Sequence, residues 1–172
     1  MIMPNVLDQL DKLIASKKGT AIFGQPASEA AIAALEKKLG RALPPLHREF
    51  LLRHDGGFIC TFMAESDKDW NLGTARWNSN TFLSVADIGK QWKQWKQIWE
   101  EMGADYPCIP CMQTENQELL VFGAANKKGE SPVLDAFHEL PPEEWRVLFK
   151  SFEALVSAYL KGKGKIETIA SG

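Results

Sequence analysis

The chain has 172 residues, 45% of them hydrophobic and 24% charged, which is the composition of a single soluble globular domain. Its formal net charge of -2 excludes the global basic field that attracts nucleic acid. No apolar run approaches the ~18 residues of a membrane span, and three cysteines, an odd number, do not make a disulfide framework. We therefore expect a cytoplasmic, reducing location and neither a nucleic-acid nor a membrane partner.

The N-terminal part of the chain has the pattern of two amphipathic helices. Residues 5–16 carry one apolar stripe, and Asn5 is placed to cap it. A second helix is predicted over residues 28–39, because Ser28 can accept from the first backbone N–H groups of a helix. Gly40 then suits the left-handed conformation that ends a helix.

The stretch LPPLHREFLLRHDGG, residues 43–57, has the composition of a catalytic loop but also the spacing of a short helix. Its prolines can begin a helix, and Asp55-Gly56-Gly57 tolerates the positive φ that ends one. His47 and His54 are seven residues apart, so they lie roughly 10 Å apart along a helix axis and cannot share a metal ion or a proton. We therefore interpret the stretch as a helix with its start and stop signals.

The middle of the chain is predicted to form strands and then a long helix. Three strands are predicted, within residues 58–63, 70–77 and 81–85, from aromatic and β-branched composition around glycine, asparagine and serine. A long helix follows over residues 84–103, in which Ser84 and Asp87 resemble a capping box. Apolar residues step along it by four and three, and this stripe is more typical of packing against a sheet than of a stacking platform for bases or sugars. The stripe consists of Ile88, Trp92, Trp95, Trp99 and Met102.

The C-terminal part predicts three further strands, within residues 108–113, 118–122 and 132–137. The last helix lies within residues 143–160, with a possible break near Ser151, which could cap a separate final helix. Because helices and strands come in blocks, the fold class is α+β with a mostly antiparallel sheet. We expect one domain over residues 1–160 and a flexible tail over residues 161–172.

Cys108 and Cys111 form a C-x-x-C motif, the spacing of redox and zinc sites. A redox pair needs a helix N-terminus to stabilise its thiolate, whereas this motif lies in a predicted strand, where residues three apart point to opposite faces. Pro110 could bend the chain and bring the two thiols together, but zinc would need two more ligands and no second motif supplies them. Buried structural cysteines are the expected alternative, and no cofactor is expected.

The charges are unevenly distributed along the chain. Residues 100–144 hold ten acidic and two basic residues, a net charge of about -8, which leaves about +6 for the remainder. Acidic groups that gather on one face would attract a basic partner and speed its association. Scattered loop charges that keep the protein soluble are the alternative interpretation.

Residues 28–57, SEAAIAALEKKLGRALPPLHREFLLRHDGG, resemble the opening signature of the SUKH superfamily, also called the Smi/Knr type. That signature is a helix ending in Leu-Gly, then Leu-Pro, a short helix with Phe-Leu, and Asn-Gly-Gly. The matching residues here are Leu39-Gly40, Leu43-Pro44, Phe50-Leu51 and Gly56-Gly57. His47 stands where an aromatic residue, usually Tyr, is common, and Asp55 replaces Asn, which keeps much of the same turn tolerance.

Two later segments also resemble the family. Residues 108–137 are similar to its central strands, with Glu-Asn-Gln-Glu in place of the usual Gly-Gly-Asp, and residues 150–160 are similar to its closing Ser-Phe helix. The resemblance implies a twisted antiparallel sheet flanked by helices. It also implies a binding protein: many bacterial members are immunity proteins that neutralise a toxin, often a nuclease, and fungal members regulate cell-wall assembly. No catalytic residues are associated with the family, so the resemblance implies none in this chain.

We therefore expect a non-enzymatic protein-binding domain, of the immunity type, that masks a basic toxin with its acidic 100–144 region. A regulatory scaffold for cellular protein partners is the first alternative, and a thiol or metal protein centred on Cys108 and Cys111 is the second. The oligomeric state is left open. The candidate contact residues are Asp105, Glu115, Glu118, Glu130 and Asp135, with Trp70 and Trp77 as aromatic anchors.

Overall fold

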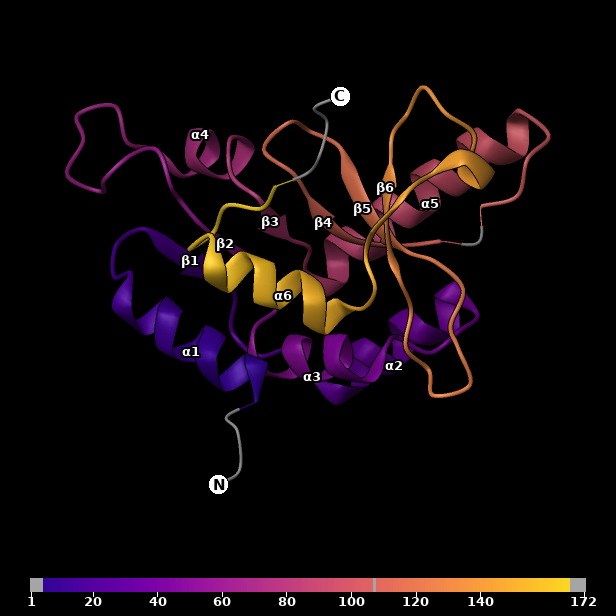
Figure 1. Cartoon of the computed structure of the whole chain (residues 1–172), viewed down its shortest axis with the longest axis horizontal. Coiled ribbons are helices and arrows are strands. Elements are labelled where there is room, and N and C mark those ends of the chain that lie inside the picture. Colours follow the sequence, from indigo (N-terminus) through magenta and orange to yellow (C-terminus); the bar gives the residue numbers. More distant parts are fainter. Residues whose placement is uncertain (1–4, 107, 168–172) are drawn as a thin grey trace.

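The computed structural model describes residues 5–106 and 108–167, and it contains one antiparallel sheet of seven short strands in chain order. Each strand pairs with the next in sequence, so the connections lie alternately at the two ends of the sheet (Figure 1). The strands are β1 (Ala21–Phe23), β2 (Gly57–Ile59), β3 (Thr81–Phe82), β4 (Ile109–Gln113), β5 (Leu119–Phe122), β6 (Val133–Ala136) and β7 (Val147–Phe149). The predicted α+β class with an antiparallel sheet is confirmed.

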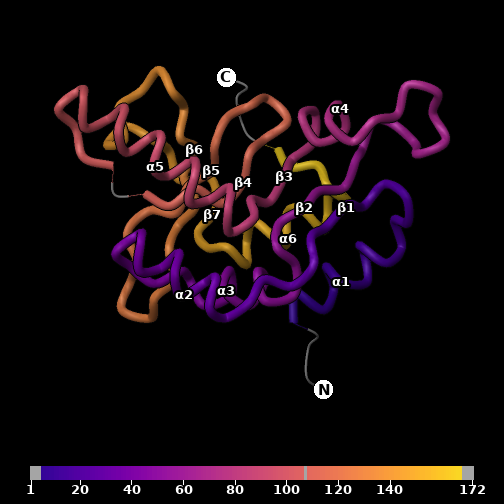
Figure 2. Tube along the Cα trace, turned by 180° about the vertical axis from the view of Figure 1, so that it is seen from behind, coloured from indigo at the N-terminus to yellow at the C-terminus, as the bar shows by residue number. Residues whose placement is uncertain are grey.

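Helices cover both faces of the sheet. α6 lies in front of the strands in Figure 1 and packs against α1 and α3, whereas α5 lies on the opposite face, in front in Figure 2, and packs against β4 and α2. The helices are α1 (Val6–Ser16), α2 (Glu29–Leu39), α3 (Pro45–Arg53), α4 (Leu72–Trp77), α5 (Val85–Glu101) and α6 (Phe152–Lys161), with a 3-10 turn η1 (Pro142–Glu144). Among the described residues, no helix has both the length and the apolar character needed to cross a bilayer.

Local capping explains where most helices begin. Asn5 and Ser28 accept backbone N–H groups at the starts of α1 and α2, as predicted. Ser84 accepts from the backbone of Asp87 at the start of α5, 3.1 Å away. Ser151 caps α6, so the predicted break in the last helix is confirmed. The helix predicted before that break is wrong, because Val147–Phe149 pair with β6 as the strand β7, after the 3-10 turn η1.

One strand prediction is wrong. Residues 70–77 were expected to pair in the sheet, but Leu72–Trp77 form the helix α4. The Asn71 side chain accepts from Thr74 N at 2.7 Å, and this capping bond closes a helical turn that a composition argument does not register. The strand predicted over residues 58–63 is present but ends early, at Ile59.

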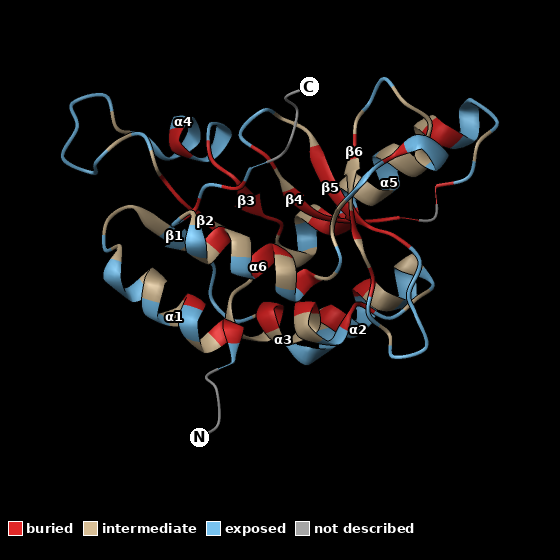
Figure 3. Ribbon diagram, in the orientation of Figure 1, coloured by how far each residue is buried: buried red, intermediate tan, exposed pale blue. Residues whose placement is uncertain are grey.

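The core lies where the two helical layers meet the central strands. β5 is buried along its whole length, because helices cover both faces at that point (Figure 3). On the α6 side, rings of Phe50, Phe82, Phe152 and Tyr159 contact one another. On the α5 side, the predicted tryptophan stripe packs inward except at its end. Ile88 and Trp99 are buried, Trp92 and Trp95 are half-buried, and Met102 is exposed.

The chain continues to pack after α6. Asn80 Nδ2 donates to the carbonyl of Gly164 at 3.1 Å, and Ile166 is buried. The predicted division at residue 160 between a domain and a tail stays a prediction, and residues 168–172 of that tail lie outside the described residues.

Candidate functional site

His47 is a core side chain. Its ring is fully buried against Phe122 and Phe152, with Phe50 stacked on it, and neither ring nitrogen has a hydrogen-bond partner among the described residues. Burial lowers the pKa of His47 to about 3. The ring therefore stays neutral at physiological pH and takes the place of the aromatic residue that is common at this position of the resembled family.

His54 lies at the other end of α3 and meets α1 instead. Its Nε2 lies 2.7 Å from Asp11 Oδ1, and the neighbouring Arg53 guanidinium forms ion pairs with Asp8, Asp11 and Glu49. These contacts fasten α3 to α1, so the two histidines serve different parts of the structure and share no site. The helix interpretation of residues 43–57 accounts for both.

The cysteines are packed as apolar side chains. Cys60, Cys108 and Cys111 are all buried and form no disulfide. Burial raises the pKa of Cys108 to about 11 and that of Cys111 further, so neither thiol is ionised near neutral pH. The described residues also contain no group of three His, Cys, Asp or Glu side chains placed to hold a metal ion.

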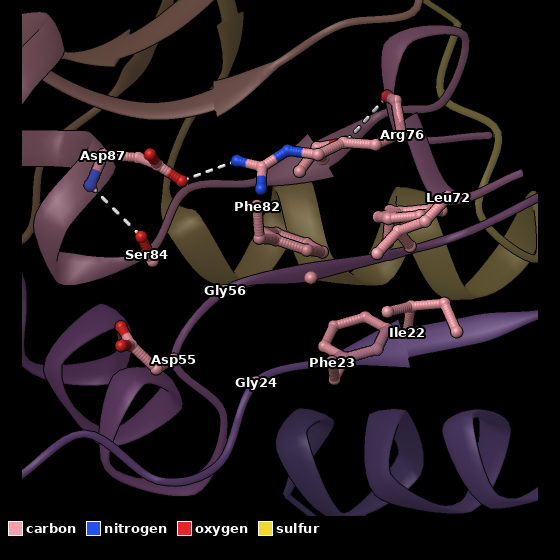
Figure 4. Close-up of a pocket in the computed structure, with 13 residues that line it drawn as sticks. Ile22, Phe23, Gly24, Asp55, Gly56, Leu72, Arg76, Phe82, Ser84 and Asp87 are labelled. Carbon is pink, nitrogen blue, oxygen red and sulfur yellow. Dashed lines mark hydrogen bonds and ion pairs between the residues drawn. The ribbon is translucent and has the colours of Figure 1, made fainter. Parts of the chain in front are cut away.

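A groove of about 220 Å³ lies beside α4, and we refer to it as the α4 groove (Figure 4). β1, β2 and β3 supply its floor, α4 supplies one wall, and the start of α5 supplies the far end. Figure 4 shows apolar side chains at one end, with Ile22 and Phe23 below and Leu72 and Phe82 above. Ile22 is 36% exposed and Leu72 is 55% exposed, so this end presents apolar surface to the outside.

The other end of the α4 groove is polar. Arg76 and Asp87 form an ion pair of 2.6 Å across it. Asp55 accepts the backbone N–H of Val85 at 2.7 Å, and so ties the turn after α3 to the start of α5. Gly56, at φ +74°, lets the two segments approach this closely, because a Cβ there would lie 2.6 Å from Ser84 N. The Asp-Gly-Gly turn is thus a structural part of the groove.

Sequence reasoning missed the α4 groove. Leu72 and Arg76 are four residues apart, which places them on one face of either a helix or a strand, so their spacing does not distinguish the two. The available signal was Asn71, a good helix N-cap directly before them. Ile22 and Asp87 reach the groove only through strand pairing and helix packing, which no local pattern indicates.

The predicted contact residues lie at two ends of the sheet. Glu115 and Glu118 occupy the β4–β5 turn, and Glu118 Oε1 lies 2.9 Å from His138 Nδ1 on the β6–β7 loop. Asp135 is close by: its burial, and next the charge of Glu118, raise its pKa. Glu130 lies instead on the β5–β6 loop, at the opposite end, so the structure does not bring it together with the others.

The remaining acidic residues continue from the β6–β7 loop to the end of α5. Trp145, which follows η1, contacts the rings of Trp99 and Tyr106, so η1 lies against the C-terminal part of α5. Asp105 and Glu143 line the same cavity. The β4–β5 turn, the β6–β7 loop and the end of α5 all lie along the upper side of the molecule in Figure 1. We call this region the acidic end, and its residues are Glu100, Glu101, Asp105, Glu115, Glu118, Asp135, Glu139, Glu143 and Glu144.

The two candidate tryptophans differ in their accessibility. Trp77 is 63% exposed at the end of α4, and its carbonyl accepts from the Gln117 side chain of the β4–β5 turn, which places it beside the acidic end. Trp70 is half-buried and packs on a small cluster that contains Phe58 and Ala75. Of the two, only Trp77 presents most of its side chain to solvent.

Comparison with known proteins identifies the family of the chain. A search of curated proteins finds no match. The family model of the SMI1 / KNR4 family (SUKH-1) matches residues 26–158, which is more than half of the chain. The match includes α2, α3 and the Asp-Gly-Gly turn, the segments that carry the resemblance in the sequence. The chain therefore belongs to the SMI1 / KNR4 family (SUKH-1).

Proposed function

We propose that this chain is a non-enzymatic protein-binding domain of the immunity type, which neutralises a basic, nuclease-like toxin by covering it with the acidic end. Family membership supports a binding role in a toxin-immunity or regulatory setting. The observation that carries the proposal is that nine of the ten carboxylates of residues 100–144 lie on the end of α5, the β4–β5 turn, β6 and the β6–β7 loop, segments that lie along one side of the molecule in Figure 1. Loop charges that served only for solubility would be scattered instead.

Few cations neutralise this acidic end. Lys96 pairs with Glu100 at 2.6 Å, His138 lies beside Glu118, and the charge of Arg146 acts on Asp135. Glu115, Glu139, Glu143 and Glu144 form no ion pair within residues 5–106 and 108–167. Unneutralised like charges repel one another, and a basic partner would relieve that repulsion while being steered toward this end.

A toxin partner can be sought directly in the cells that make this protein. The full chain, carrying an affinity tag, is used to capture bound proteins at low and at high salt, and these are identified by mass spectrometry. Retention of a basic, nuclease-like protein at low salt, and loss of its nuclease activity when the pure chain is added, would support the proposal. Capture of a cell-envelope or housekeeping protein instead would contradict the immunity role and favour the regulatory scaffold.

The proposed setting is the reducing cytoplasm, which is consistent with three buried free thiols. A second test therefore concerns expression. Co-production of the chain with the captured toxin in the same cells is expected to restore growth, whereas a chain exported to the periplasm is expected not to protect. Protection by the exported form alone would contradict the proposed location.

A further inference from the structure

We propose that the α4 groove is an anchor pocket for the protein partner, and that it takes an apolar side chain from a segment that also carries a lysine or arginine. The inference rests on the proposed function, because its occupant is part of a basic protein. It goes beyond that function in two respects. It assigns a second contact site, made of residues outside the acidic 100–144 region, and it states which side chains of the partner would occupy that site.

The apolar end of the groove is suited to one inserted side chain. Ile22 and Leu72 face each other from β1 and α4, so an aliphatic or aromatic group inserted between them would contact both (Figure 4). Phe82 lies behind them in the groove and is 1% exposed. Most large apolar side chains of the chain are buried, whereas Ile22 and Leu72 stand exposed at the mouth of a cavity. A concave apolar site with polar groups at its edge is the usual form of an interface anchor site.

The polar end of the groove favours a cation over an anion. Asp55 uses Oδ1 for the N–H of Val85, and Asp87 uses Oδ2 for Arg76. The other oxygen of each carboxylate forms no hydrogen bond with the described residues, and the two carboxylates exceed the one guanidinium by one negative charge. A lysine or arginine of the partner would complete the hydrogen bonding of these oxygens.

The α4 groove is continuous with the acidic end through α4 itself. Leu72 and Arg76 line the groove, and Trp77, one residue on, is bonded through its carbonyl to Gln117 of the β4–β5 turn. Glu115 lies in that same turn. One partner surface can therefore place an apolar side chain in the groove and basic side chains on the carboxylates of the turn, which is the arrangement of a buried anchor with a polar rim.

Binding of short peptides to the ¹⁵N-labelled full chain, followed by NMR, tests the groove without the partner. The probe is the capped tripeptide Lys-Leu-Arg, and the matched probes are Lys-Gly-Arg and Glu-Leu-Glu. We expect Lys-Leu-Arg to shift the amide resonances of the groove, including Gly24 and Arg76, with millimolar affinity. We expect Lys-Gly-Arg and Glu-Leu-Glu to bind roughly ten-fold more weakly, because each lacks one half of the recognised chemistry.

Variants separate the groove from other exposed apolar surface. The double variant Ile22→Ser with Leu72→Ser is expected to weaken Lys-Leu-Arg binding roughly ten-fold. The control is Met102→Ser with Val147→Ser, which removes two exposed apolar side chains outside the groove. Arg76→Met releases Asp87 from its ion pair, so we expect this variant to bind the basic peptide more tightly. If the ion pair only stabilised the fold, its loss would not tighten peptide binding.

Three results would overturn the inference. They are shifts of equal size with Glu-Leu-Glu, no groove shifts at saturating Lys-Leu-Arg, or groove shifts that appear on raising the protein concentration alone. The last would assign the groove to a second copy of this chain. Charge reversal of Glu139, Glu143 and Glu144 leaves the groove intact, so peptide binding should persist in that variant. Failure of toxin capture together with intact peptide binding would refute the proposed function and leave the groove standing.

Discussion

The hydroxyl of Tyr159 on α6 accepts the backbone N–H of Ile59 on β2 at 2.8 Å, and so joins two segments that are 100 residues apart in the chain. Both residues are buried, and burial raises the pKa of the Tyr159 hydroxyl, which therefore stays protonated. The bond fixes α6 against the strand that leads into the α4 groove. It also satisfies a backbone donor of β2 that would otherwise be buried without a partner.

Removal of this hydroxyl should destabilise the protein. Tyr159→Phe leaves the Ile59 N–H unpaired in the core, so we expect the free energy of unfolding to fall by about 1–3 kcal/mol. Urea denaturation at pH 7 measures this change in the free energy of unfolding. Tyr106→Phe is the matched control, because the Tyr106 hydroxyl is equally buried but has no hydrogen-bond partner among the described residues. We expect that variant to be neutral or more stable, and equal losses in both variants would contradict the role of the bond.

Acid should destabilise the protein through His47. Its pKa is about 3 in the folded state and about 6.5 in the unfolded chain, so the unfolded state binds one more proton between these values. Stability is therefore fully present above pH 6.5 and falls as the pH is lowered toward 3, by up to about 1.4 kcal/mol per pH unit from this group.

The variant His47→Phe tests this contribution, because it keeps a ring among Phe122 and Phe152 but cannot be protonated. Free energies of unfolding measured from pH 7 to pH 4 are expected to fall less steeply in the variant than in the parent. His138→Phe, which replaces an exposed histidine, is the control. Parallel pH profiles for the parent and His47→Phe would show that His47 is not the group responsible.

The close approach at Gly56 should make it irreplaceable. Gly56→Ala places a Cβ 2.6 Å from Ser84 N and 2.7 Å from Phe82 O, in addition to the left-handed strain at φ +74°. Gly103→Ala carries similar strain, at φ +79°, but no atom lies within 4 Å of its Cβ. We expect Gly103→Ala to cost about 1 kcal/mol and Gly56→Ala about 2 kcal/mol more. Thermal and urea unfolding of both variants measure the difference, and equal costs would rule out the steric explanation.

Charge reversal at the acidic end should slow association with the captured basic partner. The triple variant Glu139→Lys, Glu143→Lys and Glu144→Lys is expected to reduce the association rate constant roughly ten-fold or more at low salt, and to flatten its salt dependence. Stopped-flow or surface plasmon resonance measures both. The control triple, Glu29→Lys, Glu130→Lys and Glu153→Lys, makes the same change in net charge at the other end of the sheet, on the β1–β2 connection, the β5–β6 loop and the start of α6. Equal slowing in the two triples would mean that only net charge matters.

Local signals account for what could be predicted from the sequence. Asn5, Ser28 and Ser151 lie where helices begin, and each accepts a backbone N–H as a capping residue does. The same rule, applied to Asn71, would have corrected the strand predicted over residues 70–77. Composition favours a strand there, but in a segment of only six helical residues the capping bond decides the structure.

Packing between segments distant in the chain determines which residues come together in the candidate site. The acidic stretch is continuous in the sequence, but Glu130 lies at the opposite end from Glu118, because successive antiparallel strands alternate their connections between the two ends of the sheet. The α4 groove likewise combines Ile22, Leu72 and Asp87 from three separate elements.

The sequence by itself determined the family, the α+β class and the capped starts of α1, α2, α5 and α6, because capping, glycine turns and apolar periodicity act over a few neighbouring residues. Only the tertiary structure decided which carboxylates gather at one end, that His47 is neutral in an aromatic core, and that exposed Ile22 and Leu72 face one another. Those relationships depend on strand order and on contacts between residues distant in the chain, and local propensity carries no information about either.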